Sequence, residues 1–140
     1  MFMDPALVLA RCNLQSTDSV AEFGAGSGAL ARAAAALVPH GTVFAIDVHR
    51  DVVRRLAHDA ADEGLRHLYA LWGDIETHGG SMLADNSINL ALLSNVLFHL
   101  DDRGAPFKEA HRVLVPEGKL LVVDWLRTIN GVGPRPQALV

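Results

Sequence analysis

Three glycines at alternate positions, Gly24, Gly26 and Gly28, form the segment of the sequence with the clearest chemical potential. They follow an apolar run that ends at Phe23 and precede a stretch rich in alanine and leucine. Glycine lets the backbone adopt positive φ and lets a ligand lie directly against the peptide. The N–H groups at the start of a helix also attract anionic groups. The pattern therefore predicts a strand, a ligand-binding turn and a helix, which is typical of nucleotide-binding α/β sheets.

The acid Glu22, two residues before the first glycine, bears on which ligand this turn binds. The spacing from Gly24 to Ala29 satisfies the permissive dinucleotide pattern, so a nicotinamide cofactor is one alternative. A carboxylate at Glu22 would repel a pyrophosphate but could accept hydrogen bonds from an ammonium group. A third explanation is a plain tight turn, in which the glycines only allow a helix to pack closely on a strand. The acid and the third glycine favour a ligand that presents an ammonium group.

A second acid, Asp47, follows the next predicted strand at 42–46. It lies close to the ~20 residues beyond the glycine turn at which a ribose-binding acid is expected. Its carboxylate could accept both ribose hydroxyls, and the neighbouring Val48 could lie against an adenine ring. The alternative role, as a cap of the following helix, is already filled by Asp51 in the first turn of that helix. We therefore assign Asp47 to ribose binding.

Apolar patterns predict the elements that position these groups. The expected elements are a helix at 5–13 after the cap Asp4, a strand at Ser19–Phe23, a helix ending near Val38, a strand at 42–46, a helix at 50–63, a strand from His67 to Leu71 or Trp72, a loop at 78–86, a strand at 88–93, a helix starting at Asp101–Asp102, a turn at 115–118 and a strand at 119–124. Strands that alternate with helices predict a doubly wound, mostly parallel α/β sheet of about five strands. Residues 1–140 are expected to form one domain.

Two segments resemble a known family. Glu22-x-Gly24-x-Gly26-x-Gly28 resembles motif I of the class I S-adenosylmethionine-dependent methyltransferases. The segment from His111 to Leu120 resembles the signature between a helix and strand five in the ubiquinone-biosynthesis-like and related small-molecule methyltransferases. The resemblance covers nearly the whole chain. It implies a Rossmann-like fold, S-adenosylmethionine as cofactor, and methyl transfer as the reaction.

The resemblance also assigns roles to individual residues. The glycine turn would hold the methionine moiety, Asp74 would accept the adenine amino group, and Ile75 would pack on the adenine ring. The full predicted cofactor set is Glu22, Phe23, Gly24, Ala25, Gly26, Gly28, Asp47, Val48, Gly73, Asp74, Ile75, Ser94 and Asn95. His99, after the fourth strand, is the candidate general base, with shaping of the pocket as its alternative role. No metal site is predicted.

The chain departs from the family pattern after the fifth strand. Residues 126–140 contain several glycines and prolines and are too few for a further helix and strands six and seven. The strand at 119–124 would then be an exposed apolar edge, and such edges favour pairing, so we expect a homo-oligomer. The methyl-donor site would be open, and a partner subunit or the acceptor itself would have to cover it. A fold-over of Phe2–Asp4 onto the cofactor, or a truncated form without its native lid, are the alternatives.

Composition limits the partners and the compartment. The chain has 140 residues, a net charge of −4 and one cysteine. An acidic protein is not expected to hold nucleic acid by charge alone. A basic segment with Arg54 and Arg55 keeps RNA open as an acceptor, although a solvated helix surface is the simpler explanation. One cysteine fits a reducing compartment, and no run of 18 apolar residues or leader occurs, so we expect a cytoplasmic protein.

The leading interpretation is a methyltransferase core that acts on an unidentified acceptor, either a small molecule or RNA. The sequence lacks an Asn-Pro-Pro-aromatic motif after the fourth strand, which argues against methylation of exocyclic amino groups of nucleobases. The alternative is a non-catalytic module that binds S-adenosylmethionine or regulates a partner. The short C-terminal region is the feature that most favours this alternative.

Overall fold

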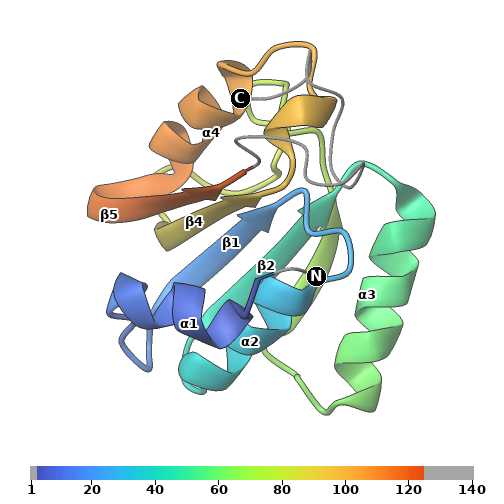
Figure 1. Cartoon of the computed structure of the whole chain (residues 1–140), viewed down its shortest axis with the longest axis vertical. Coiled ribbons are helices and arrows are strands. Elements are labelled where there is room, and N and C mark those ends of the chain that lie inside the picture. Colours follow the sequence, from blue (N-terminus) through green and yellow to red (C-terminus); the bar gives the residue numbers. More distant parts are fainter. Residues whose placement is uncertain (1–2, 125–140) are drawn as a thin grey trace.

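Five parallel strands form the central sheet, in the order β3-β2-β1-β4-β5. The computed structural model describes residues 3–124. The strands are β1 Ser19–Phe23, β2 Thr42–Asp47, β3 Leu68–Trp72, β4 Ile88–Ser94 and β5 Leu114–Val123, and all end at the same edge (Figure 1). The strand order reverses between β1 and β4, and open α/β sheets bind ligands at such a switch point. The predicted doubly wound parallel sheet is thus confirmed, whereas the prediction about residues 126–140 lies outside the described residues.

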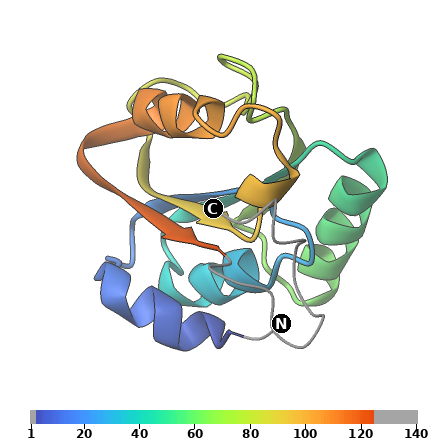
Figure 2. The same ribbon diagram turned by 45° about the horizontal axis from the view of Figure 1, so that its top comes forward.

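Helices cover both faces of this sheet (Figure 2). They are α1 Pro5–Leu9, which continues as the 3-10 turn η1 Ala10–Cys12, α2 Ala29–Leu37, α3 Arg50–Asp62, the 3-10 turn η2 Leu97–His99 and α4 Ala105–Val113. The first three helices lie on one face, and α4 lies on the other together with the segment 73–87. No helix in the described part of the chain is long and apolar enough to cross a membrane.

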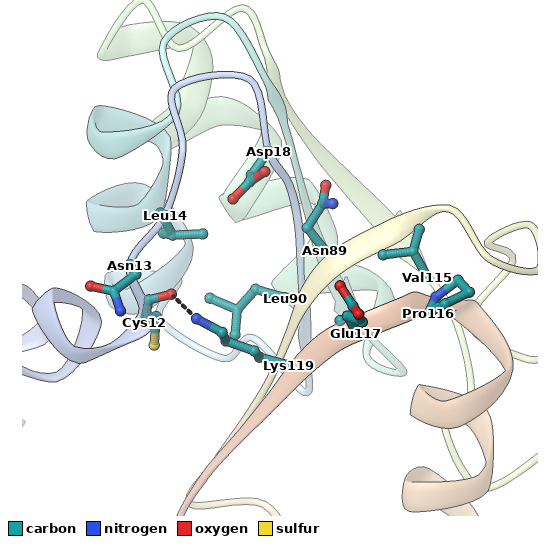
Figure 3. A pocket seen from close by; sticks show the side chains of 11 residues that line it. Cys12, Asn13, Leu14, Asp18, Asn89, Leu90, Val115, Pro116, Glu117 and Lys119 are labelled. Atoms are coloured by element: carbon teal, nitrogen blue, oxygen red, sulfur yellow. Dashed lines mark hydrogen bonds between the residues drawn. The ribbon is translucent and has the colours of Figure 1, made fainter.

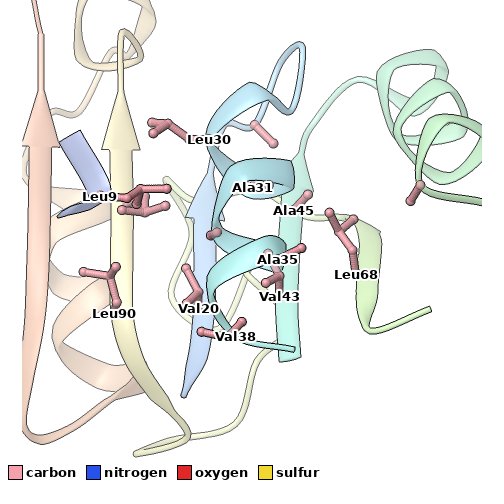
Figure 4. Close-up of a cluster of buried hydrophobic side chains, with 14 of the residues drawn as sticks. Leu9, Val20, Leu30, Ala31, Ala35, Val38, Val43, Ala45, Leu68 and Leu90 are labelled. Carbon is pink, nitrogen blue, oxygen red and sulfur yellow. The ribbon is translucent and has the colours of Figure 1, made fainter. Parts of the chain in front are cut away.

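The sheet divides the apolar core into two clusters. The cluster under α1, α2 and α3 includes Leu9, Val20, Leu30 and Leu56, all at most 2% exposed (Figure 4). The α2 positions that meet the sheet are small, notably Ala31 and two further alanines, so the helix lies close to β1 and β2. Because successive side chains of a strand point to opposite faces, the same strands supply both clusters. This packing fixes the strand ends that carry the predicted site.

Local capping signals set several of the predicted boundaries. The Asp4 carboxylate accepts a hydrogen bond from the Ala6 N–H at 2.9 Å and caps α1. Gly64, with φ +70°, follows the end of α3, where a left-handed residue is favoured. The predicted start of the first helix and the predicted end of α3 are thus confirmed.

Three predicted features differ in the structure. The turn expected at 115–118 lies inside β5, where the register against β4 shifts between Ile88 and Leu90 and Glu117 has φ +68°. A bulge therefore replaces the turn, and β5 starts at Leu114 and ends at Val123. Helix α4 begins at Ala105, after the expected start at Asp101–Asp102. The α-helix predicted at 5–13 ends at Leu9 and continues as the 3-10 turn η1, whereas the loop predicted at 78–86 is confirmed, because no helix lies between β3 and β4.

Candidate functional site

The glycine turn between β1 and α2 has positive φ at all three glycines: +74° at Gly24, +53° at Gly26 and +76° at Gly28. A Cβ at Gly24 would lie 2.5 Å from Val96 Cγ2, and one at Gly28 would lie 2.4 Å from Leu56 Cδ2. A Cβ at Gly26 would meet nothing within 4 Å. Close packing thus accounts for the first and third glycines. The middle glycine leaves a bare peptide surface that a ligand can approach.

Asp47, at the end of β2, lies beside this turn. Its Oδ2 accepts a hydrogen bond from the Gly26 N–H and its Oδ1 accepts one from the His49 N–H, both at 3.0 Å. An ionised carboxylate has about four acceptor positions, so two remain for the hydroxyls of a ligand. The side chain is held by its neighbours before any ligand binds. The structure therefore brings the predicted ribose acid and the glycine turn together.

Val48 and Trp72 form the outer border of this region. Val48 is 49% exposed, as a surface for a ligand ring requires. The Trp72 Nε1–H donates to the Val48 carbonyl at 2.8 Å, and the Arg50 guanidinium lies 4.8 Å from the centre of the indole ring. Sequence reasoning missed Trp72. An aromatic residue directly before Gly73 at a strand end was the available signal.

Glu22 lies on β1 and is 3% exposed. Its Oε1 accepts a hydrogen bond from the Ala31 N–H at 3.1 Å, which ties the strand to the first turn of α2. Burial raises the pKa of Glu22 to about 8, the hydrogen bond from Ala31 opposes this shift, and the charge of Asp47 adds to it. At neutral pH the side chain is therefore mostly protonated in the free protein. It becomes a charged partner only where a cation compensates for the burial.

Ser94, the last residue of β4, carries a buried hydroxyl with no hydrogen-bond partner among the described residues. Glu22 pairs in register with Leu92, so Ser94 lies on the same face of the sheet as Glu22, one pleat further toward the carboxyl edge. The next residue, Asn95, has φ +54°, and its N–H donates to the Val123 carbonyl at 2.8 Å. Buried polar groups are almost always paired, so the Ser94 hydroxyl marks a position that a ligand or water completes.

The segment after β3 is held by its own side chains. The Asp74 Oδ1 accepts from the Glu76 N–H and its Oδ2 accepts from the Thr77 hydroxyl, both at 3.0 Å. A Cβ on Gly73 would lie 2.7 Å from the Gly80 carbonyl oxygen. Ile75 is 7% exposed and packs in the second core cluster, below the loop. The contacts of Asp74 and Ile75 with an adenine ring stay predictions.

His99 ends the 3-10 turn after β4 and is exposed. Its ring centre lies 4.0 Å from that of Phe98. The same turn is fixed by Asp124, whose Oδ2 accepts a hydrogen bond from the Leu97 N–H at 3.0 Å. Sequence reasoning did not select Asp124, because an acid directly after an edge strand gives no local signal. A role for His99 as a base remains a prediction.

A cavity of about 250 Å³ lies at the opposite end of the sheet (Figure 3). Cys12, Asn89 and Lys119 are among the residues that line it, and the Lys119 Nζ donates to the Cys12 carbonyl at 3.2 Å. Asn89 is the second residue of β4, so the cavity lies far along the strand from Ser94. It belongs to a different region from the predicted site residues, which gather at the carboxyl edge.

Comparisons with known proteins agree with this arrangement. A family model described as a methyltransferase domain matches residues 21–122. An uncharacterized protein of transposon TN4556 from Streptomyces fradiae is 32% identical over 123 residues, which is 86% of this chain but 34% of that protein. The chain thus spans about a third of the length of this curated relative.

Solved structures share the fold. The structure of a SAM-dependent methyltransferase from Aquifex aeolicus superimposes with a TM-score of 0.87 at 25% identity, over 98% of this chain and 72% of that one. The [4+2]-cyclase SpnF superimposes with a TM-score of 0.81 at 24% identity, over 96% of this chain and 49% of that one. The neighbours include several kinds of methyltransferase, so the ubiquinone-like subgroup stays a prediction.

The residues at the carboxyl edge fit S-adenosylmethionine. The bare peptide at Gly26 admits a ligand, Asp47 retains acceptor positions, and the unpaired Ser94 hydroxyl and the carboxyl of Glu22 lie on one face beside them. The family match covers most of the chain, from β1 to the last strand of the sheet. The chain therefore belongs to the methyltransferase domain family and has the fold of the S-adenosylmethionine-dependent methyltransferases.

Proposed function

We propose that this domain binds S-adenosylmethionine as its cofactor and transfers the methyl group to a small-molecule acceptor. The observation that carries the proposal is the hydrogen bond from the Gly26 N–H to Asp47 at the switch point of the sheet. A bare glycine peptide and the acid that we assign to the ribose therefore lie side by side. Membership in the methyltransferase domain family supports the reaction class.

Each predicted residue has a distinct task in this proposal. Asp47 accepts the ribose hydroxyls, Val48 lies against adenine, and Glu22 faces the ammonium of the methionine moiety. The cofactor carries an activated methyl group on a sulfonium centre, so the protein mainly has to position the acceptor beside it. His99, exposed on the turn after β4, is within the region where an acceptor would bind and is the candidate base.

The charge of the carboxyl edge favours a small molecule over RNA. Glu76, Asp102 and Asp124 lie in the segments after β3, β4 and β5. The Glu76 Oε2 accepts a hydrogen bond from the Asp102 N–H at 3.1 Å, and the Asp124 Oδ2 accepts one from the Leu97 N–H at 3.0 Å. Phosphates would be repelled by this acidic border.

The basic residues of α2 and α3 are only in part available to RNA. Arg32 lies 3.5 Å from Asp59 and 3.4 Å from Glu63, and Arg55 donates to the Gly26 carbonyl. These side chains already serve contacts within the protein. RNA binding is thus the less supported of the two predicted acceptor classes.

A non-catalytic module that binds the cofactor remains the second candidate function. A fold does not by itself determine a reaction, so binding of the cofactor without methyl transfer is the alternative to be tested. The assay that separates the two uses methyl-labelled S-adenosylmethionine with a panel of amine, hydroxyl and thiol acceptors and one RNA. Transfer to any small acceptor that stops on replacement of Asp47 supports the enzyme. Tight binding with no transfer across the panel supports the module.

Cofactor affinity is expected to depend on pH through Glu22. The pKa of about 8 lies above the usual value, so the folded protein retains a proton on Glu22 up to that pH, and an ammonium ligand must displace it. Affinity for S-adenosylhomocysteine should therefore rise by up to about tenfold per pH unit from pH 6 to 8 and level off above. Titration calorimetry at pH 6, 7, 8 and 9 measures this, with Glu22→Gln as the variant in which the slope disappears. Equal slopes in both proteins would rule out the role of Glu22.

The edge of β5 is proposed to pair with a second copy of the chain. β5 is one of the two edge strands of the described sheet, and Leu120 and Val122 are 36% and 37% exposed on it. Apolar edge strands favour pairing. We expect a dimer at tens of micromolar in sedimentation velocity and a monomer on replacement of both residues by lysine. A monomeric wild-type protein would contradict this.

The single cysteine, Cys12, supports a reducing compartment such as the cytoplasm as the place of action.

A further inference from the structure

We propose that Arg55 of α3 is a positioning residue that holds the peptide of Gly26 in the conformation required for cofactor binding. The Arg55 Nη2 donates to the Gly26 carbonyl oxygen at 2.6 Å, although the two residues lie 29 positions apart. On the other side of the same residue, the Gly26 N–H donates to Asp47. The link to cofactor binding rests on the proposed function.

Gly26 needs such a contact more than the other two glycines do. Gly24 packs against Val96, and Gly28 packs against Leu56, as the short distances from their Cβ positions show. Gly26 has open space where a side chain would be, so packing does not restrict it. Glycine also has the widest choice of backbone conformations. Two hydrogen bonds, from Gly26 to Asp47 and from Arg55 to Gly26, therefore supply the restraint.

Helix α3 is well placed to provide this restraint. It begins at Arg50, directly after His49, whose N–H donates to the Oδ1 of Asp47. Leu56, the residue after Arg55, is 2% exposed and lies against Gly28. Asp47, the glycine turn and α3 thus all contact one another. Arg55 adds a further contact between α3 and the turn, on the side that faces solvent.

Loss of the arginine is expected to lower the fraction of the protein that is ready to bind. The measured affinity of a ligand falls in proportion to that fraction. A hydrogen bond from a charged donor to a carbonyl at 2.6 Å is at the short, strong end of the range. Because Arg55 is exposed, a moderate effect of about fivefold on affinity is expected. Folding should be unaffected.

The test compares Arg55→Ala and Arg55→Lys with Arg54→Ala, a neighbouring exposed arginine on the same helix. Hydrogen exchange of the free protein is measured for a peptide that spans residues 24–28, and S-adenosylhomocysteine affinity is measured by calorimetry. We expect several-fold faster exchange and about fivefold weaker binding for Arg55→Ala. Arg55→Lys, which keeps a charged donor, should restore part of both. Arg54→Ala should match the wild type, and melting temperatures should agree across the set.

The two readouts separate the two proposals. Equal exchange in Arg55→Ala and Arg54→Ala would overturn the positioning role. Faster exchange with unchanged affinity would overturn the link to binding. A wild-type protein that binds no S-adenosylhomocysteine would contradict the proposed function, and exchange in the free protein would still decide whether Arg55 holds the turn.

Discussion

Replacement of Asp47 by alanine is expected to weaken S-adenosylmethionine binding by about a hundredfold or more. Two hydrogen bonds from ribose hydroxyls to a charged acceptor are lost, each worth about 1.5 kcal/mol or more. The Gly26 N–H also loses its acceptor, so the glycine turn loses one of its two restraints. Both effects act on the same site and in the same direction. Titration calorimetry on the wild type and the variant measures the loss.

Two further variants separate the causes of this loss. Asp47→Asn keeps an acceptor oxygen without the charge, and we expect it to lie between the wild type and Asp47→Ala. Asp51→Ala removes an exposed acid from the first turn of α3 and should bind as the wild type does. An Asp47→Ala protein that folds and binds within threefold of the wild type would remove Asp47 from the site.

The second large effect concerns stability. Glu109 of α4 is 1% exposed and accepts four hydrogen bonds: from the N–H of Gly79 at 2.9 Å, from the N–H of Ser81 at 3.0 Å and from two guanidinium nitrogens of Arg112 at 2.8 Å. Arg112 also donates to the Leu83 carbonyl at 2.7 Å. The pair fixes the helix-free segment 73–87 on α4. Removal of the Glu109 carboxyl leaves the N–H groups of Gly79 and Ser81 without an acceptor and the half-buried Arg112 with Asp85 as its remaining counterion. Breaking a buried pair in this way typically costs about 3–5 kcal/mol.

We therefore expect Glu109→Ala to lower the free energy of unfolding by about 3 kcal/mol or more in urea denaturation. Lys108→Ala, an exposed neighbour on the same helix, should change it by less than about 0.5 kcal/mol. A loss below about 1 kcal/mol for Glu109→Ala would mean that the pair does not hold the segment.

The loss of folding stability at low pH is expected to depend on Glu109 as well. Burial alone would raise the pKa of Glu109, but the hydrogen bonds from Arg112, Ser81 and Gly79 outweigh it and lower the pKa to about 2. A lowered folded-state pKa stabilises the protein above the unfolded-state pKa near 4.3, and this contribution is lost as the pH falls toward 2. Urea denaturation from pH 5 to 2 should show this loss in the wild type. In Glu109→Gln, the part of this loss that comes from protonation of Glu109 should disappear. A variant whose free energy of unfolding depends on pH as in the wild type would contradict the role of Glu109.

Much of the site could be predicted because residue type and strand period determine it locally. The apolar runs locate the ends of β1 and β2, and the residues at those ends, Glu22 and Asp47, then meet by the geometry of a parallel sheet. The glycine spacing predicts the turn between them in the same way. The structure adds the packing reason for Gly24 and Gly28, which contact side chains far along the chain.

The parts that the sequence did not predict depend on contacts between distant segments. Arg55 looks like any exposed helix residue until α3 is placed beside the glycine turn. The protonation of Glu22 follows from burial, which no local pattern contains. Arg112 lies within the segment that resembles a family signature, yet its partner Glu109 and its bond to the Leu83 carbonyl emerge only in three dimensions. The bulge in β5 likewise depends on its register with β4.

The most direct test of the central claim is calorimetric titration of the wild-type protein with S-adenosylmethionine, S-adenosylhomocysteine and NAD, at pH 8 where Glu22 has begun to ionise. The account predicts micromolar binding of the first two compounds and no detectable binding of NAD. Binding of NAD in their place, or binding of none of the three, would contradict it.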